Sequence, residues 1–198
     1  TGKVVYRSSN TAVAEPDQFG YITIKKAGSC TITARVAADA NYKSASAGYQ
    51  LVVSKKDMTK KKVKLSKTSY IYAGKNCKPK AVVSGLARSD YKVTYKNADK
   101  PGTAICVITG KGNYSGKIEV PYSINLAKTV ITKITNKKSG VSLTWKKVAG
   151  AKGYRIYRRT KNGSWKRIRE LTSGKKVSFT DKTAKSVKTY EYLSVIHI

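Results

Sequence analysis

One strand–turn–strand pattern occurs twice in this chain, at residues 27–53 and again at residues 101–124. In each copy a glycine leads into an alternating apolar run, and an Asn-Tyr pair separates that run from a second one. The shared positions are Gly28 and Asn41-Tyr42 in the first copy, and Gly102 and Asn113-Tyr114 in the second. Internal similarity at this spacing predicts tandem copies of one structural unit.

The rest of the chain follows the same strand-rich pattern, and helical periodicity is almost absent. Short alternating runs of Val, Ile, Thr and Tyr recur between Gly, Asn, Asp and Ser turns, which is typical of β-sandwiches. The runs expected as strands are 4–9, 21–26, 29–38, 47–54, 63–75, 78–85, 90–97, 103–112, 117–124, 129–136, 140–148, 153–160, 164–171, 176–182 and 188–196. The fold class is therefore predicted to be all-β, in tandem β-sandwiches.

These runs divide into three segments, which we call the first (1–55), middle (56–126) and third (127–198) segments. The basic stretch Lys55–Lys62, KKDMTKKK, joins the first two. A charge run of this kind is predicted to be a solvated connector rather than a binding patch.

Residues 6–14 of the first segment read YRSSNTAVA, and residues 20–34 read GYITIKKAGSCTITA. They resemble bacterial Ig-like domains of group 2, the intimin/invasin-related type. Those domains begin with two further strands before the Ser-Ser-Asn residues, so the resemblance implies that this domain is truncated at its N-terminal side.

The middle segment contains DYKVTYKN, PGTA and GKGNYSG. These phrases look like the Ig-like repeats found in tandem on large surface proteins of Gram-positive bacteria. The alternation predicts that one set of side chains faces the core: Val83, Tyr91, Val93, Tyr95, Ala104, Cys106 and Ile108.

The third segment has Trp145 on its second predicted strand, tyrosines on the third, and the Tyr190-Glu-Tyr192 strand. It resembles a fibronectin type III domain, in which Trp145 and Tyr190 match the core Trp and the corner Tyr. The alternation is expected to break at Leu193-Ser194. A seventh strand is missing from the pattern, so the resemblance implies a domain truncated at its C-terminal side.

Catalytic and metal sites are not expected. The ten carboxylates are spread singly along the chain, with no pair spaced for acid–base work. The three cysteines lack metal-ligand spacing, and His197 is the only histidine. Cys30 and Cys106 have inward parity and are expected as buried free thiols, while a bridge between Cys77 and Cys106 is left open. The sequence therefore predicts no catalytic residue, no cofactor and no metal.

Charge is the other outlier: 41 Lys and Arg face 10 Asp and Glu, a formal net charge of +31. Such a field attracts polyanions, although a solvated basic surface that keeps a tandem array soluble is the alternative. Lys greatly outnumbers Arg and is scattered, which favours diffuse attraction over specific phosphate recognition. No apolar run approaches the roughly 20 residues that span a bilayer, so no membrane insertion is predicted. Nothing in the pattern indicates an oligomer.

The third segment concentrates this charge, with 19 Lys and Arg against 3 Asp and Glu. Asn162-Gly163 between two alternating runs predicts a hairpin with a two-residue turn. Basic and aromatic side chains on one face of that hairpin could grip polyanions or glycans. In the alternative, the aromatic side chains cover the core and the Arg stems shield them. The candidate contact residues are Arg155, Tyr157, Arg159, Trp165, Arg167 and Arg169.

The family resemblances imply a non-catalytic spacer or adhesive segment of a larger secreted or cell-surface protein from a Gram-positive bacterium. Its partners would be cell-wall polyanions, host glycans or host proteins. The alternative is a set of carbohydrate- or wall-polyanion-binding accessory modules of a secreted enzyme. Nucleic acid, suggested by charge alone, is not expected as a specific partner.

Overall fold

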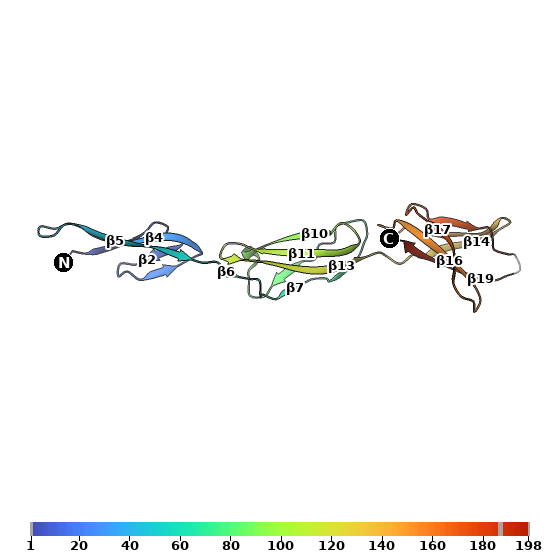
Figure 1. Cartoon of the computed structure of the whole chain (residues 1–198), viewed down its shortest axis with the longest axis horizontal. Helices are drawn as coiled ribbons and strands as arrows, with labels where there is room; N and C mark the ends of the chain where they lie inside the picture. The colour runs from blue at the N-terminus through green and yellow to red at the C-terminus, as the bar shows by residue number, and fades with distance from the viewer. Residues whose placement is uncertain (1, 186–187, 198) are drawn as a thin grey trace. The chain divides into compact units, whose positions relative to one another are not determined.

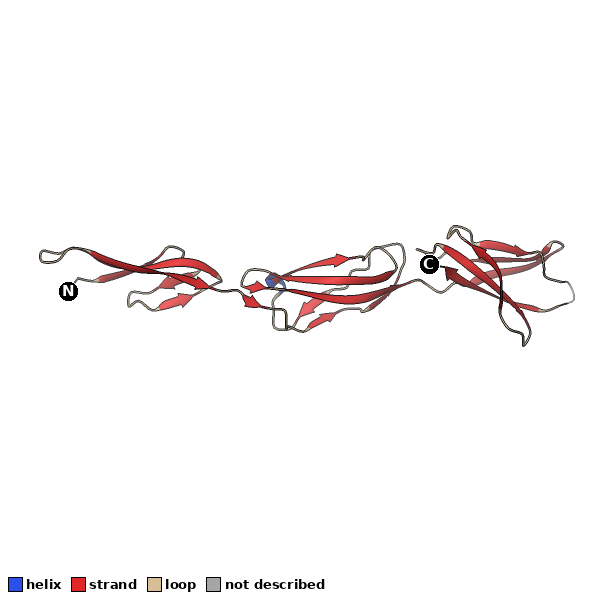
Figure 2. Cartoon of the chain, viewed as in Figure 1, coloured by secondary structure: helices blue, strands red, loops and turns tan. Residues whose placement is uncertain are grey.

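The computed structural model describes residues 2–185 and 188–197, without the side chain of His197. Its regular structure is almost entirely β-strand (Figure 2), as predicted. The chain divides into two compact units. The first consists of Thr1–Lys64, Ala81–Thr94 and Val107–Val120, and the second consists of Leu65–Lys80, Tyr95–Cys106 and Pro121–Ile198. No helix in the described part of the chain is long and apolar enough to cross a membrane.

The first segment has five strands in two sheets, ordered β1-β4-β5 and β2-β3 (Figure 1). They are β1 (Val4–Ser8), β2 (Ala14–Pro16), β3 (Ile22–Ile24), β4 (Gly28–Val36) and β5 (Ala45–Val53). Only β2 was not predicted. The core of this segment is small, and consists of Val13, Ala14, Cys30 and Ile32 with Ile22, Leu51 and Val53 packed against them.

The two Asn-Tyr pairs of the repeated pattern lie at bends of the chain, with Tyr114 already in β12, and each pair is held differently. In the first copy, Asp39 Oδ1 accepts hydrogen bonds from the backbone N–H groups of Asn41 and Tyr42, at 2.9 and 2.8 Å. In the second copy, Asn113 Oδ1 accepts one from the N–H of Ala27, at 2.9 Å, and the Asn113 carbonyl accepts another from Lys56, at 2.8 Å. The second pair therefore ties the first segment to the start of the middle one.

The middle segment is built on a four-stranded sheet of order β10-β11-β13-β8, with the short pairs β7-β9 and β12-β6. Strands β10, β11 and β13 continue from one compact unit into the other. The bounds are β6 (Lys56–Asp57), β7 (Val63–Leu65), β8 (Ser69–Ile71), β9 (Ala81–Val83), β10 (Tyr91–Lys96), β11 (Gly102–Gly110), β12 (Tyr114–Ser115) and β13 (Lys117–Asn125), with a 3₁₀ turn at Arg88–Asp90.

The basic connector differs from its prediction. Its lysines are mostly exposed, but Lys56–Asp57 pairs with Tyr114–Ser115 as a parallel strand. Met58 is fully buried, and its N–H donates to the Ser115 carbonyl at 3.0 Å. A flexible apolar side chain in a run of lysines can anchor the run, because Met fills irregular gaps in a core. Part of the stretch is thus anchored by strand pairing and by a buried side chain rather than being a fully solvated connector.

The predicted inward set of the middle segment is confirmed: five of its members are buried, and Val93 and Tyr95 are half-buried. Cys30, Cys77 and Cys106 are free and buried, so the structure has no Cys77–Cys106 bridge. Burial raises the pKa of the Cys106 thiol. Burial also raises the pKa of Tyr122 to about 12, and its hydroxyl donates to the Cys77 carbonyl at 2.6 Å.

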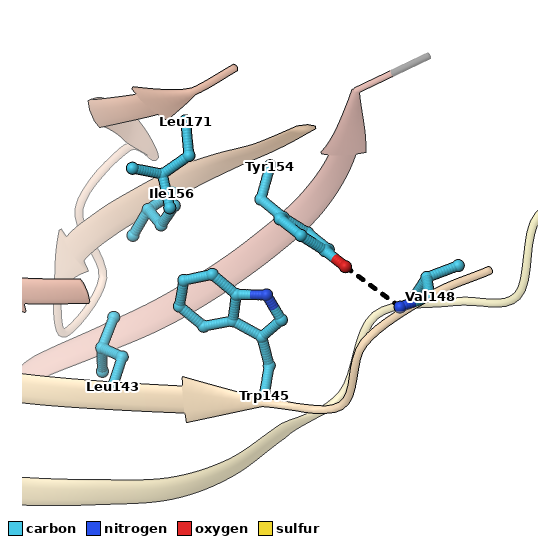
Figure 3. Packing of buried hydrophobic residues seen from close by; sticks show 6 residues of the cluster. All are labelled: Leu143, Trp145, Val148, Tyr154, Ile156 and Leu171. Atoms are coloured by element: carbon cyan, nitrogen blue, oxygen red, sulfur yellow. Dashed lines mark hydrogen bonds between the residues drawn. The ribbon is translucent and has the colours of Figure 1, made fainter. Parts of the chain in front are cut away.

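The third segment forms two three-stranded sheets, ordered β14-β15-β18 and β17-β16-β19. The strands are β14 (Ile131–Lys137), β15 (Gly140–Trp145), β16 (Gly153–Thr160), β17 (Lys166–Leu171), β18 (Ser178–Asp181) and β19 (Tyr190–His197). The sheets enclose the cluster drawn in Figure 3: Leu143, Trp145, Val148, Tyr154, Ile156 and Leu171.

The expected break at Leu193-Ser194 is wrong. Strand β19 pairs with β16 without interruption from Tyr190 to His197. Alternation in exposure continues, because Ser194 is buried while Leu193 and Val195 are each 42 % exposed. Here a polar residue faces inward and two apolar residues face outward, the reverse of the usual pattern, and the strand therefore looks broken in the sequence.

Each hydrogen-bonded sheet of the described residues contains strands from one of the three segments only. The segment boundaries themselves remain a prediction.

Candidate binding surface of the third segment

The predicted hairpin exists, but a two-residue turn does not join its strands, because β16 ends at Thr160 and β17 begins only at Lys166. Strands β16 and β17 pair antiparallel, and the Gly163 N–H donates to the Thr160 carbonyl at 2.9 Å. The two central residues of the turn that this hydrogen bond closes are therefore Lys161 and Asn162 rather than Asn162-Gly163. Asn162 adopts the left-handed conformation, with φ of 63°. Asn tolerates this conformation better than most non-glycine residues, which suits Asn162 to this position of the turn.

We expect Asn162→Val to lower the free energy of unfolding by about 1–2 kcal/mol, because a β-branched side chain is strained at positive φ. Asn162→Gly should change it by less than about 0.5 kcal/mol, since glycine takes this conformation without strain. Both tryptophans of the chain lie in the third segment, so urea unfolding followed by tryptophan fluorescence measures this segment. Equal destabilisation by Val and Gly would contradict the placement of the turn.

The alternation along β16 is confirmed: Tyr154 and Ile156 are buried in the core, and Arg155, Tyr157 and Arg159 point to the other face, each half-buried. We call the outward side of the β17-β16-β19 sheet the outer face. Arg167 lies on it directly opposite Tyr157.

Arg169 does not share this face. The register shifts between Ile156 and Tyr157, so that Ile156 pairs with Arg169 while Tyr157 pairs with Arg167. Ile168 is the extra residue of this bulge, and it packs against the core. Residues that pair across a sheet share a face, so Arg169 falls on the side of buried Ile156. An outward position for Arg169 was therefore wrong, because strict alternation does not anticipate a bulge.

Two carboxylates engage the arginines of the outer face. Glu170 lies 3.3 Å from Arg155 and 3.0 Å from Arg167, each measured from a carboxylate oxygen to a guanidinium nitrogen. Glu191 on β19 lies 2.6 Å from Arg159. All three arginines pointing outward are therefore paired, and the face carries far less free charge than its arginines suggest.

Aromatic and aliphatic side chains fill the rest of the outer face. The Arg159 guanidinium stacks over the Trp165 ring, 4.6 Å from its centroid, and Trp165 remains 38 % exposed. Leu193 and Val195 lie directly opposite Tyr157 and Arg155 on the neighbouring strand. The sequence reasoning missed these two residues and both glutamates. The alternation continues through residues 190–196 although polar and apolar residues exchange faces. Following it would have placed Glu191, Leu193 and Val195 on the outer face.

The core side of the same sheet holds an ion pair between a buried aspartate and a partly exposed arginine, and this pair joins the two sheets. Arg158 on β16 donates to Asp181 on β18 at 2.7 Å, and the Asp181 side chain is only 2 % exposed. Asp181 also accepts hydrogen bonds from the hydroxyls of Thr183 and Tyr192, at 2.7 and 3.0 Å. Arg158 lies over the Tyr190 ring, 4.5 Å from its centroid.

The surroundings of Asp181 set its ionisation. Burial alone would raise the pKa of Asp181, but hydrogen bonds from Thr183, Arg158 and Tyr192 outweigh burial and hold this pKa below its ordinary value. Burial, with the hydrogen bond to Asp181, raises the pKa of Tyr192. All three carboxylates of the third segment therefore form ion pairs with arginines, and four of the five arginines of this segment take part.

Among the described residues, no group of three or more His, Cys, Asp or Glu side chains is placed to hold a metal ion. The side chain of His197 lies outside this description. The outer face offers ion-paired guanidinium groups and exposed apolar side chains, an arrangement suited to binding rather than to proton transfer.

Comparison with known families matches residues 1–39 to the intimin immunoglobulin-like domain. This match supports a bacterial Ig-like domain in the first segment, in agreement with the resemblance of its sequence. It does not extend to the middle or third segment. No curated protein matches the chain.

Proposed function

We propose that this chain is a non-catalytic spacer and adhesive segment of a larger bacterial surface protein. The observation that carries the proposal is the combination of an all-β structure with an intimin Ig-like match in its first segment. Intimin-type Ig-like domains imply display at a bacterial surface. Among the described residues, every sheet is confined to one segment, as expected for modules that fold separately along an array.

We further propose that the third segment is a fibronectin type III-like module. Its two sheets pair the first, second and fifth strands, and the third, fourth and sixth, around a buried tryptophan. Tyr190 occupies the proposed corner position, and its hydroxyl accepts a hydrogen bond from the Lys185 N–H at 3.4 Å. These features support the resemblance and leave the assignment as our proposal.

A second role, as a wall-polyanion- or glycan-binding accessory of a secreted enzyme, is favoured by the net charge of +31. The outer face of the third segment supports it weakly, because its outward arginines are paired with glutamates. Its exposed Trp165, Leu193 and Val195 suit a contact with a protein or with the apolar face of a sugar ring better than a contact with a polyanion.

Display on cells tests the spacer role. The chain would be placed between a wall anchor and an inert reporter domain, and antibody access to the reporter would be measured. A Gly-Ser linker of equal length is the control, because a flexible coil of that length spans only about 70–85 Å on average and can retract. We expect higher access with the native chain. Equal access with both would argue against a spacer.

A further inference from the structure

A groove of about 610 Å³ lies on the outer side of the β1-β4-β5 sheet in the first segment. Cys30 and Ile32 of β4 face the core, so Thr31, Thr33 and Arg35 point to the opposite side and line the groove. Strand β1 contributes Arg7 on the same side, with Lys3 before the strand. The groove is thus walled by cations and hydroxyl groups, on a sheet face that the small core does not use.

The three cations of the groove, Lys3, Arg35 and Arg7, are evenly spaced along the sheet, and we call this row of side chains the cation ladder. Arg35 pairs with Val5, and Arg7 pairs with Thr33, one two-residue step further along. Lys3 lies two residues before Val5, at the next step in the other direction. Side chains of one face recur every two residues, or roughly 6.6 Å. One cation therefore projects at each of three successive steps along the groove.

No carboxylate neutralises this ladder. None of the residues that line the groove is acidic. The three carboxylates of the first segment are engaged elsewhere: Glu15 pairs with Lys25, and Asp17 and Asp39 accept backbone N–H groups in turns. Among the described residues, Arg7 and Arg35 have no ion-pair partner, unlike the outward arginines of the third segment.

We propose that this groove binds a linear polymer carrying one phosphodiester per short repeat, of the poly(glycerol phosphate) class. Guanidinium groups bind phosphate oxygens through two parallel hydrogen bonds, and the regular step of the ladder suits evenly spaced charges. Thr33 lies directly opposite Arg7, and Ser9 and Thr31 follow one two-residue step beyond it, where their hydroxyls can donate to the polymer oxygens. This site would give a spacer a second function, attachment to a wall polyanion.

The composition of the groove favours such a polymer over single-stranded nucleic acid. Proteins that bind single strands stack the bases on aromatic side chains. No aromatic residue lines this groove, and its apolar contributions come from Val5 and Ala37. A backbone of short alkyl and phosphate units can use these contacts, whereas bases would remain unstacked.

Binding of fluorescent poly(glycerol phosphate) to the whole chain tests the proposal. We expect Arg7→Gln/Arg35→Gln to weaken binding at least tenfold at near-physiological salt. Arg159→Gln/Arg167→Gln removes the same charge from the third segment and should weaken binding less than twofold, because those arginines are already paired. The groove variant should also lower the slope of log affinity against log salt by about 1–2, for two lost phosphate contacts.

A charge-preserving variant separates geometry from charge and does not depend on the Gln variant folding. Arg7→Lys/Arg35→Lys keeps both charges but loses the two-pronged contact, so an intermediate loss of about three- to tenfold is expected. Equal weakening by the groove and control Gln variants would overturn the proposal in favour of diffuse charge. Tighter binding of oligothymidylate at equal phosphate number would also overturn it, as would no binding of the wild-type chain at physiological salt. The spacer function would survive all three results.

Discussion

Trp145→Ala is expected to unfold most of the third segment. Removing this buried side chain deletes a large apolar group and leaves a cavity between the two sheets, which costs about 3–5 kcal/mol. Trp145 packs against Tyr154, with ring centroids 5.3 Å apart, and Tyr154 in turn accepts a hydrogen bond from the Val148 N–H at 3.0 Å (Figure 3). A segment of this size has a total stability of only about 3–10 kcal/mol.

Trp145→Phe is the matched control. The indole N–H of Trp145 is buried without a hydrogen-bond partner in the described structure. Phe removes that unpaired donor, whose burial costs about 1–3 kcal/mol, and this gain offsets part of the lost packing. We expect a net loss of about 1–2 kcal/mol in urea unfolding followed by Trp165 fluorescence. Equal losses for Ala and Phe would show that the cavity is not the main cost.

Asp181→Asn is expected to lower the free energy of unfolding of the third segment by about 2–3 kcal/mol. The change leaves the Arg158 guanidinium, which is 21 % exposed, without its carboxylate at the junction of the two sheets. Breaking a fully buried pair costs more, and the partial exposure of Arg158 reduces the effect. Glu191→Gln breaks the more exposed pair with Arg159 and should cost less than about 1 kcal/mol.

The pH dependence of this effect has a defined sign. The pKa of Asp181 in the folded chain lies below its ordinary value of 3.8, so its stabilising contribution is fully present above that value. The contribution is lost as the pH falls through the folded pKa, because the native carboxylate then takes up its proton. The difference between wild type and Asp181→Asn should therefore be constant from about pH 5 to 7 and shrink below pH 3.8. A constant difference down to the acid transition would contradict the assignment.

Fold class followed from the sequence because alternation is a local signal. The inward residues of β10 and β11, such as Tyr91 and Cys106, were placed correctly from strand parity alone. Local signals failed where tertiary contacts override them. Met58 looked like part of a solvated connector, yet it is anchored by pairing with residues 114–115, far along the chain. The bulge at Ile168 likewise shifted Arg169 to the other face, and a bulge leaves no mark in alternation.

The candidate site was only half predictable for the same reason. Parity placed Arg155, Tyr157 and Arg159 on one face, but it could not show that Glu170 and Glu191 lie beside them. Their proximity depends on the register of three strands, one of which is distant in sequence from the other two. The groove of the first segment escaped notice because Lys3 and Arg7 lie far from Arg35 in the sequence, and the three cations come together only when β1 pairs with β4.

Force-extension of the whole chain, held at its two ends, tests the central claim most directly, because a spacer made of separate folded modules must unfold in discrete steps. We expect separate rupture events, one of which releases residues 56–126, or about 250 Å of extended chain at ~3.5 Å per residue. Trp145→Ala should abolish the event of the third segment and leave the middle one unchanged. Smooth extension without discrete events, or a single event for the whole chain, would contradict an array of separately folded segments.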